Sequence, residues 1–173
     1  MIRTWRGRAP KLHRRAFVHE SAEIIGMVTL KDRASVWPLC SLRGDLEPIV
    51  VGERSNIQDL CVIHTQRGRP TRIGRWVTIG HHATLHGCRI GDRTLIGMGA
   101  IVMEADIGRG CFVAAGSLVL GGFVAPPGSL VMGSPARVVR RVGPKERAAI
   151  AYGARAYLKR TAEHLKTSRA VFS

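Results

Sequence analysis

The sequence predicts an all-β solenoid, a parallel β-helix of hexapeptide repeats followed by a C-terminal α-helix. Three observations carry this prediction. Aliphatic residues return every five or six positions over most of the chain, and small residues stand two positions before them. Aromatic residues make up only 5% of the chain, while 20 of the 173 residues are glycine. Self-similarity at a short fixed period is the signature of repeat architectures, and a narrow β-helix has little room for aromatic rings.

The aliphatic series has two insertions and three residues per expected coil. Its members are all Val, Ile or Leu: Val18, Ile24, Leu30, Val36 and Leu42, then Val51, Ile57 and Ile63, then Ile73, Ile79, Leu85, Ile90, Ile96, Val102, Ile107, Val113, Val119, Val124 and Leu130. Side chains at i and i−2 lie on the same side of a strand, so each hexapeptide turns one large and one small residue inward. All four cysteines occupy the small positions: Cys40, Cys61, Cys88 and Cys111. We therefore expect a triangular prism with buried thiols.

The chain divides into three parts on this pattern. Residues 1–17 are expected to form an N-terminal strand or lead-in, 18–135 the β-helix domain, and 136–173 a C-terminal helix and tail. The helix is expected from Pro144 to about Lys166, because proline suits the first helical turn. Gly153 weakens the helical pattern. One stripe should pack along a face of the prism: Ile150, Ala154, Tyr157, Leu158 and Leu165.

The charge is strongly basic, with 27 Lys and Arg against 12 Asp and Glu and a formal net charge of +15. Such an excess is typical of proteins that meet nucleic acid, anionic membranes or acidic substrates. However, Trp5, Trp37 and Trp76 stand in no interleaved basic and aromatic motif, so we expect no nucleic-acid partner and no membrane partner. The cysteines form no CxxC pair, which favours reduced thiols and a cytoplasmic location.

Counting hexapeptides brings histidines together. If Val51, Ile57 and Ile63 mark faces one, two and three of a coil, His64 and His86 follow face three in consecutive coils and lie about 5 Å apart. Two such imidazoles can share one metal ion. Arg43 follows Leu42 and joins the same column.

His81 stands two residues after Ile79 on face two, in a column with Asp59 and beside Gln58. It cannot join His64 and His86 within one chain. A three-fold arrangement would bring the two polar columns of neighbouring chains together, so the geometry predicts a homotrimer with three-histidine sites shared between chains. His13, His19 and His164 are expected to be solvated, His82 to point elsewhere, and the cysteines to serve packing.

Several stretches are similar to the gamma-class carbonic anhydrase family of left-handed β-helix trimers. They are SLRGDLEPIVVGERSNIQDLCVIHT (41–65), TIGHHATLHGCRIGDRTLIGMGAIV (78–102) and GSPARVVR (133–140). The resemblance, and not the physics of crossover connections, implies left-handedness. It also implies that His64, His81 and His86 bind the metal. Matching positions around them place catalytic or interface roles on Arg43, Asp45, Asn56, Gln58, Asp59 and Tyr157, with Asp59 a partner of Arg43 across the interface.

The resemblance implies reversible hydration of carbon dioxide to bicarbonate through a metal-bound hydroxide. Three neutral imidazoles leave the charge of the metal undiminished, with Zn²⁺ the default and Fe²⁺ or Co²⁺ also accepted. One departure matters, because Leu46 and Arg67 stand where proton-transferring glutamates are expected. The alternatives are an acyl-CoA thioesterase, a hexapeptide acyltransferase, and a non-enzymatic trimeric metal-binding scaffold.

Overall fold

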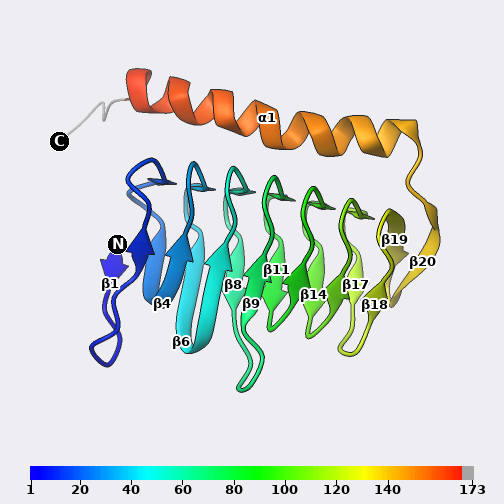
Figure 1. The fold of residues 1–173 in the computed structure, drawn as a ribbon, viewed down its shortest axis with the longest axis horizontal. Helices are drawn as coiled ribbons and strands as arrows, with labels where there is room; N and C mark the ends of the chain where they lie inside the picture. The colour runs from blue at the N-terminus through cyan, green and yellow to red at the C-terminus, as the bar shows by residue number, and fades with distance from the viewer. Residues whose placement is uncertain (169–173) are drawn as a thin grey trace.

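In the computed structural model, which describes residues 1–168, the chain winds into a parallel β-solenoid of the left-handed type (Figure 1). About seven turns stack along the long axis, and the single helix α1 (Pro144–Thr167) lies beside them along most of that axis. This architecture confirms the predicted class of fold. Among residues 1–168, no helix is both long enough and apolar enough to cross a membrane.

The strands form three faces. Face one consists of β2 (Lys11–Leu12), the second halves of β4 (Glu23–Leu30) and β6 (Ser41–Val51), β9 (Thr71–Ile73), β12 (Arg89–Ile90), β15 (Asp106–Ile107) and β18 (Val124–Ala125). Face two consists of β3 (Phe17–Val18), β5 (Ser35–Val36), β7 (Asn56–Ile57), β10 (Thr78–Ile79), β13 (Leu95–Ile96), β16 (Phe112–Val113) and β19 (Ser129–Gly133). Face three consists of β1 (Ile2–Arg3), the first halves of β4 and β6, β8 (Val62–His64), β11 (Thr84–His86), β14 (Ile101–Met103) and β17 (Leu118–Val119).

The core lies inside the prism, where the repeat predicted it. Aliphatic residues of consecutive coils pair in register, as Leu42 with Ile63, Ile63 with Leu85 and Leu85 with Val102 on face three. These side chains are fully buried, and so are the cysteines and alanines two positions before them. Stacking at the strand spacing therefore fills the interior with alternating large and small side chains.

The predicted core is wrong in the last coil. Val124 is 66% exposed, and Ala125, which is 2% exposed, takes the inward place and pairs with Ile107. Leu130 is buried but pairs with Phe112, so Val131 occupies the inward position instead. The step after Val119 is six residues and not five, and the sequence pattern favoured the larger aliphatic over the alanine beside it.

The ends of the solenoid differ from a plain repeat. The N-terminal strand β1 pairs with β4, Ile2 lying opposite Ile24, so the chain joins face three from its start. At the other end, β20 (Ala136–Arg141) folds back antiparallel to β19, a strand that the repeat does not indicate. It caps the open edge of face two and leads into α1, because an unpaired edge would leave backbone groups without partners.

The helix α1 begins with Pro144 and a hydrogen bond in which Glu146 Oε2 accepts the backbone N–H of Gly143 at 2.6 Å. Arg140 donates to the same carboxylate at 2.8 Å and, with the Gly143 bond, lowers the pKa of Glu146 to about 2. The helix packs closely on face two. A Cβ atom on Gly153 would lie 2.9 Å from Thr78 Oγ1, which explains the glycine in the middle of the helix.

The apolar stripe of α1 is confirmed in its first half and wrong at its end. Ile150, Ala154 and Tyr157 are buried, but Leu165 is 65% exposed. The inward position at that turn is taken by His164, whose ring centroid lies 5.4 Å from that of Phe17 and 5.6 Å from that of Trp37. His164 is therefore half-buried in an aromatic cluster and not the solvated residue that was expected.

The thiols give a test of the buried core. Burial raises the pKa of Cys111, and it raises that of Cys88 to about 12, because a thiolate is disfavoured away from water. Both side chains stay protonated at pH 8, so we expect iodoacetamide to leave them unmodified in the folded protein. Cys40 and Cys61 are also buried, so inaccessibility should protect them too, and mass spectrometry should find all four cysteines alkylated only after denaturation. Rapid labelling of Cys88 in the folded protein would contradict this packing.

Candidate metal centre

His64 and His86 lie side by side at the end of face three. They close strands β8 and β11 and are direct register partners, with ring centroids 5.2 Å apart and an interplanar angle of 45°. Ile63 and Leu85, which precede them, point into the core, so the two imidazoles point outward. Arg43 follows Leu42, the partner of Ile63, and lies at the same corner. The structure brings together the column that hexapeptide counting predicted.

Asp45 binds both neighbours in this column. Its Oδ1 lies 2.9 Å from His64 Nε2, and its Oδ2 accepts a hydrogen bond from Arg43. Burial acts to raise the pKa of Asp45, but the hydrogen bonds from His64 and Arg43 outweigh burial and leave the pKa below its ordinary value. The carboxylate is therefore charged at neutral pH and holds the orientation of the imidazole.

His81 lies at the other end of face three, in the turn after β10. Its Nδ1 is 3.0 Å from Asp59 Oδ2, and its Nε2 is 3.2 Å from the hydroxyl of Tyr157 on α1. The pairing of Ile57 with Ile79 places Asp59 and His81 in one column, as predicted. Tyr157 reaches this column because α1 packs across face two.

Buried amides hold the turn that carries His81. Gln58 Oε1 accepts the backbone N–H of His81 at 3.2 Å, and Gln58 Nε2 donates to Asn56 Oδ1 at 3.2 Å. Asn56 Nδ2 in turn donates to Thr78 Oγ1 at 3.1 Å. A satisfied buried network of this kind fixes side chains in one arrangement. Gln58 therefore positions the backbone of His81 within its own chain.

The three predicted ligands do not meet within one chain. His64 and His86 share one corner of the prism, His81 lies at the next corner, and face three separates them. Within residues 1–168 of a single chain, no three His, Cys, Asp or Glu side chains are close enough to hold a metal ion. Arg43 pairs with Asp45, and Asp59 pairs with His81, so the contact between Arg43 and Asp59 stays a prediction about two chains.

One acidic residue near the histidines was missed. Glu104 follows Met103, the register partner of His86, and its Oε1 lies 3.6 Å from His86 Nδ1. The register of β14 with β11 places it one coil beyond His86, whereas the residues at the expected glutamate positions, Leu46 and Arg67, are exposed in loops. His82 is exposed at a corner with a φ of +60°.

Curated proteins similar to this chain include one named for carbonic anhydrase. No family profile matches the chain. A "Probable carbonic anhydrase" of Methanocaldococcus jannaschii is 46% identical over 82% of this chain and 90% of its own length. "Protein YrdA" of Escherichia coli is 36% identical over 95% of this chain and 94% of its own length.

Solved structures with the same fold have other descriptions. A structure described as a putative acetyltransferase from Bacillus cereus is 34% identical, with a TM-score of 0.93 over 95% of this chain and 96% of its own. A hexapeptide transferase family protein from Anaplasma phagocytophilum is 38% identical, with a TM-score of 0.90 over 94% and 97%. The fold is thus common to proteins described by two different chemistries.

Proposed function

Because the chain belongs to the gamma-class carbonic anhydrase-like family of hexapeptide-repeat proteins, we propose that it hydrates carbon dioxide reversibly to bicarbonate. The reaction takes place at a metal site shared between two chains of a homotrimer. The proposal rests on one observation above all. His64 and His86 are adjacent at one corner of the prism, and His81 is held by Asp59 at the next corner, so the three imidazoles could meet only between two chains.

The donor set fits a divalent metal ion. His64 and His86 of one chain and His81 of a neighbouring chain offer three imidazoles, a set that suits Zn²⁺ and also accepts Fe²⁺ or Co²⁺. When bound, such an ion supplies Lewis acidity that makes water nucleophilic near neutral pH. The half-buried imidazoles and the flanking carboxylates supply the orientation that such a site requires.

The residues around the three histidines orient the imidazole rings. Asp45 orients His64, and Glu104 lies beside His86. In the single chain Asp59 and Tyr157 contact the two ring nitrogens of His81, so a metal ion would take the place of one of these contacts while the other orients the ring. Arg43 is half-exposed beside His64, and its ion pair with Asp45 holds that carboxylate next to the imidazole. In the trimer, Arg43 also binds Asp59 of the neighbouring copy.

Acyl transfer or acyl-CoA hydrolysis is the second candidate. It is favoured by the close structural likeness to proteins described as an acetyltransferase and a hexapeptide transferase, and by the net charge of +15, which suits a phosphorylated substrate. The paired histidines His64 and His86 do not by themselves indicate a thioester substrate. We therefore treat it as the alternative that the same experiment must exclude.

Stopped-flow hydration of carbon dioxide tests the proposal directly. We expect protein reconstituted with Zn²⁺, or with Fe²⁺ under anaerobic conditions, to exceed the rate of an identically treated His64→Ala variant. A thiol-release screen across acyl-CoA substrates runs in parallel on the same samples. Hydration no faster than that of His64→Ala would overturn the proposal, and metal-dependent release of CoA would replace it with the second candidate.

A further inference from the structure

A groove runs beside α1 at the corner where face one meets face two. Each coil places one residue with a positive φ at this corner, and its backbone N–H donates to the coil before it. Arg54, Trp76 and Arg93 carry large side chains here, while the following coils have Gly110 and Gly128. The two glycines leave the last part of the column without side chains, and a hollow opens between this corner and α1.

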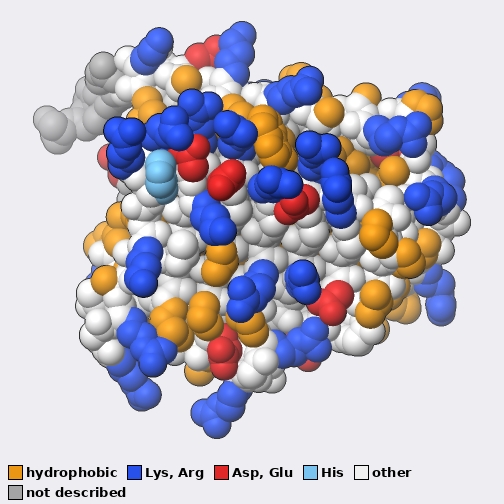
Figure 2. Space-filling model, viewed as in Figure 1, with side chains coloured by type: hydrophobic (Ala, Val, Ile, Leu, Met, Phe, Trp, Pro, Cys, Tyr) orange, Lys and Arg blue, Asp and Glu red, His pale blue; other side chains and the backbone are white. Residues whose placement is uncertain are grey.

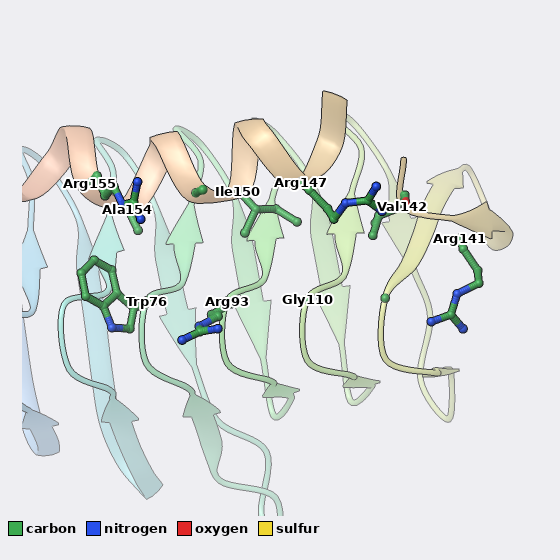
Figure 3. Close-up of a pocket in the computed structure, with 11 residues that line it drawn as sticks. Trp76, Arg93, Gly110, Arg141, Val142, Arg147, Ile150, Ala154 and Arg155 are labelled. Atoms are coloured by element: carbon green, nitrogen blue, oxygen red, sulfur yellow. Dashed lines mark hydrogen bonds between the residues drawn. The ribbon is translucent and has the colours of Figure 1, made fainter. Parts of the chain in front are cut away.

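This hollow is a groove of about 600 Å³. Figure 3 shows Trp76 and Arg93 on the solenoid side, Arg147 and Arg155 on α1, and Arg141 at the far end. Ile150 and Ala154 of α1 supply an apolar wall. Figure 2 shows Lys and Arg side chains dense along the boundary between α1 and the coils.

The arginines in this groove have no acidic partners among the residues that the structure describes. Arg93, Arg141, Arg147 and Arg155 line it without any Asp or Glu among the lining residues. Among residues 1–168, none of these four guanidinium groups forms an ion pair; Arg147 donates to the carbonyl of Val142 at 2.8 Å.

The acids nearest along the chain are already occupied. Asp92, which precedes Arg93, pairs with Arg75 at 2.9 Å, and Glu146, which precedes Arg147, pairs with Arg140 at 2.8 Å. Four like charges gathered at one groove repel one another and raise the local concentration of anions. The arrangement therefore favours an anion of several charges over a chloride or bicarbonate ion.

We propose that this groove binds a small molecule carrying two or more linked phosphate groups, such as a nucleoside triphosphate. Arginine forks bind phosphate oxygens in pairs, and four of them match the charge of a di- or triphosphate. Trp76 and Ile150 offer the apolar surface on which a ring can rest. The corner also lies opposite face three, so the trimer proposed above leaves it open to solvent.

Isothermal titration calorimetry of the full chain tests the proposal with three probes: inorganic tripolyphosphate, ATP and orthophosphate. We expect saturable binding of the first two, at least tenfold tighter than that of orthophosphate, and weaker binding as salt rises. Equal affinity for tripolyphosphate and ATP would show that the groove recognises the phosphates alone. Tighter binding of ATP would show that the groove also contacts the nucleoside ring. No saturable binding of either probe at low salt overturns the proposal.

Matched variants locate the site. Ala151→Glu puts a carboxylate into the groove from an exposed position of α1. Ala162→Glu puts the same charge at an exposed position of α1 about 16 Å further along the helix, beyond the lining residues. We expect the first to weaken tripolyphosphate binding at least tenfold and the second less than threefold. The double variant Arg93→Gln, Arg155→Gln should also weaken tripolyphosphate binding at least tenfold. The matched double variant Arg72→Gln, Arg89→Gln, on face one, should weaken it less than threefold. Equal losses in both members of a pair would show diffuse attraction by net charge and overturn the proposal.

Discussion

Replacing His81 with alanine is expected to lower metal-dependent hydration of carbon dioxide by at least about 100-fold, since loss even of groups that merely orient metal ligands costs 10- to 100-fold. The variant should also lose bound metal, measured by inductively coupled plasma mass spectrometry after reconstitution. His81 contacts Asp59 and Tyr157 in the turn after β10, outside the prism core, so the variant should keep its fold.

The next residue supplies the control for this prediction. His82 is the same residue type, is exposed, and lies in the same turn; its backbone N–H donates to the carbonyl of Asp59 at 3.0 Å, a bond that alanine retains. His82→Ala should keep metal content and hydration within a factor of two of the unaltered protein. If His82→Ala fails as badly as His81→Ala, the turn matters for folding and His81 has no special place in the site.

Shortening Leu85 to alanine is expected to destabilise the solenoid by about 2–5 kcal/mol, the usual cost of a cavity at a buried leucine. Leu85 is 0% exposed and pairs with Ile63 and Val102 in the middle of face three. Each coil contacts chiefly its neighbours, so the cavity weakens two coil interfaces at once. It also loosens the strand that carries His86.

Urea denaturation at a fixed protein concentration measures this effect, because association would otherwise shift the midpoint. Leu120→Ala is the control, since Leu120 is 44% exposed at a corner of a later coil and should cost less than about 0.5 kcal/mol. Leu85→Met, which keeps the volume, should cost less than about 1.5 kcal/mol. Equal stability of Leu85→Ala and Leu120→Ala would contradict the assignment of the core.

The fold could be predicted from the sequence because the repeat is local and the register follows from counting. Ile63 and Leu85 align without any tertiary reasoning, and the error at Val124 arose where an alanine took an inward place that pattern alone gives to valine. The strand β20 and the inward turn of His164 could not be predicted, because both depend on how the chain docks after the repeat ends.

The candidate site divides in the same way. Counting placed His64 beside His86 and His81 above Asp59, since these pairs depend only on coil register. The ion pair of Asp45 with His64 depends on the path of a loop, and the approach of Tyr157 to His81 depends on docking of α1, so only family resemblance suggested these residues. The arginine groove needed the docked helix and was not predicted at all.

Subunit mixing tests the shared site most directly. His64→Ala and His81→Ala are each expected to be inactive. A shared site is nevertheless intact in a mixed trimer wherever a His81→Ala chain supplies His64 and His86 and the neighbouring His64→Ala chain supplies His81. Random co-assembly in equal amounts should restore about one quarter of the metal content and hydration of the unaltered protein, because every mixed three-fold ring has one intact site. A co-assembled mixture as inactive as either variant alone would contradict a site shared between chains.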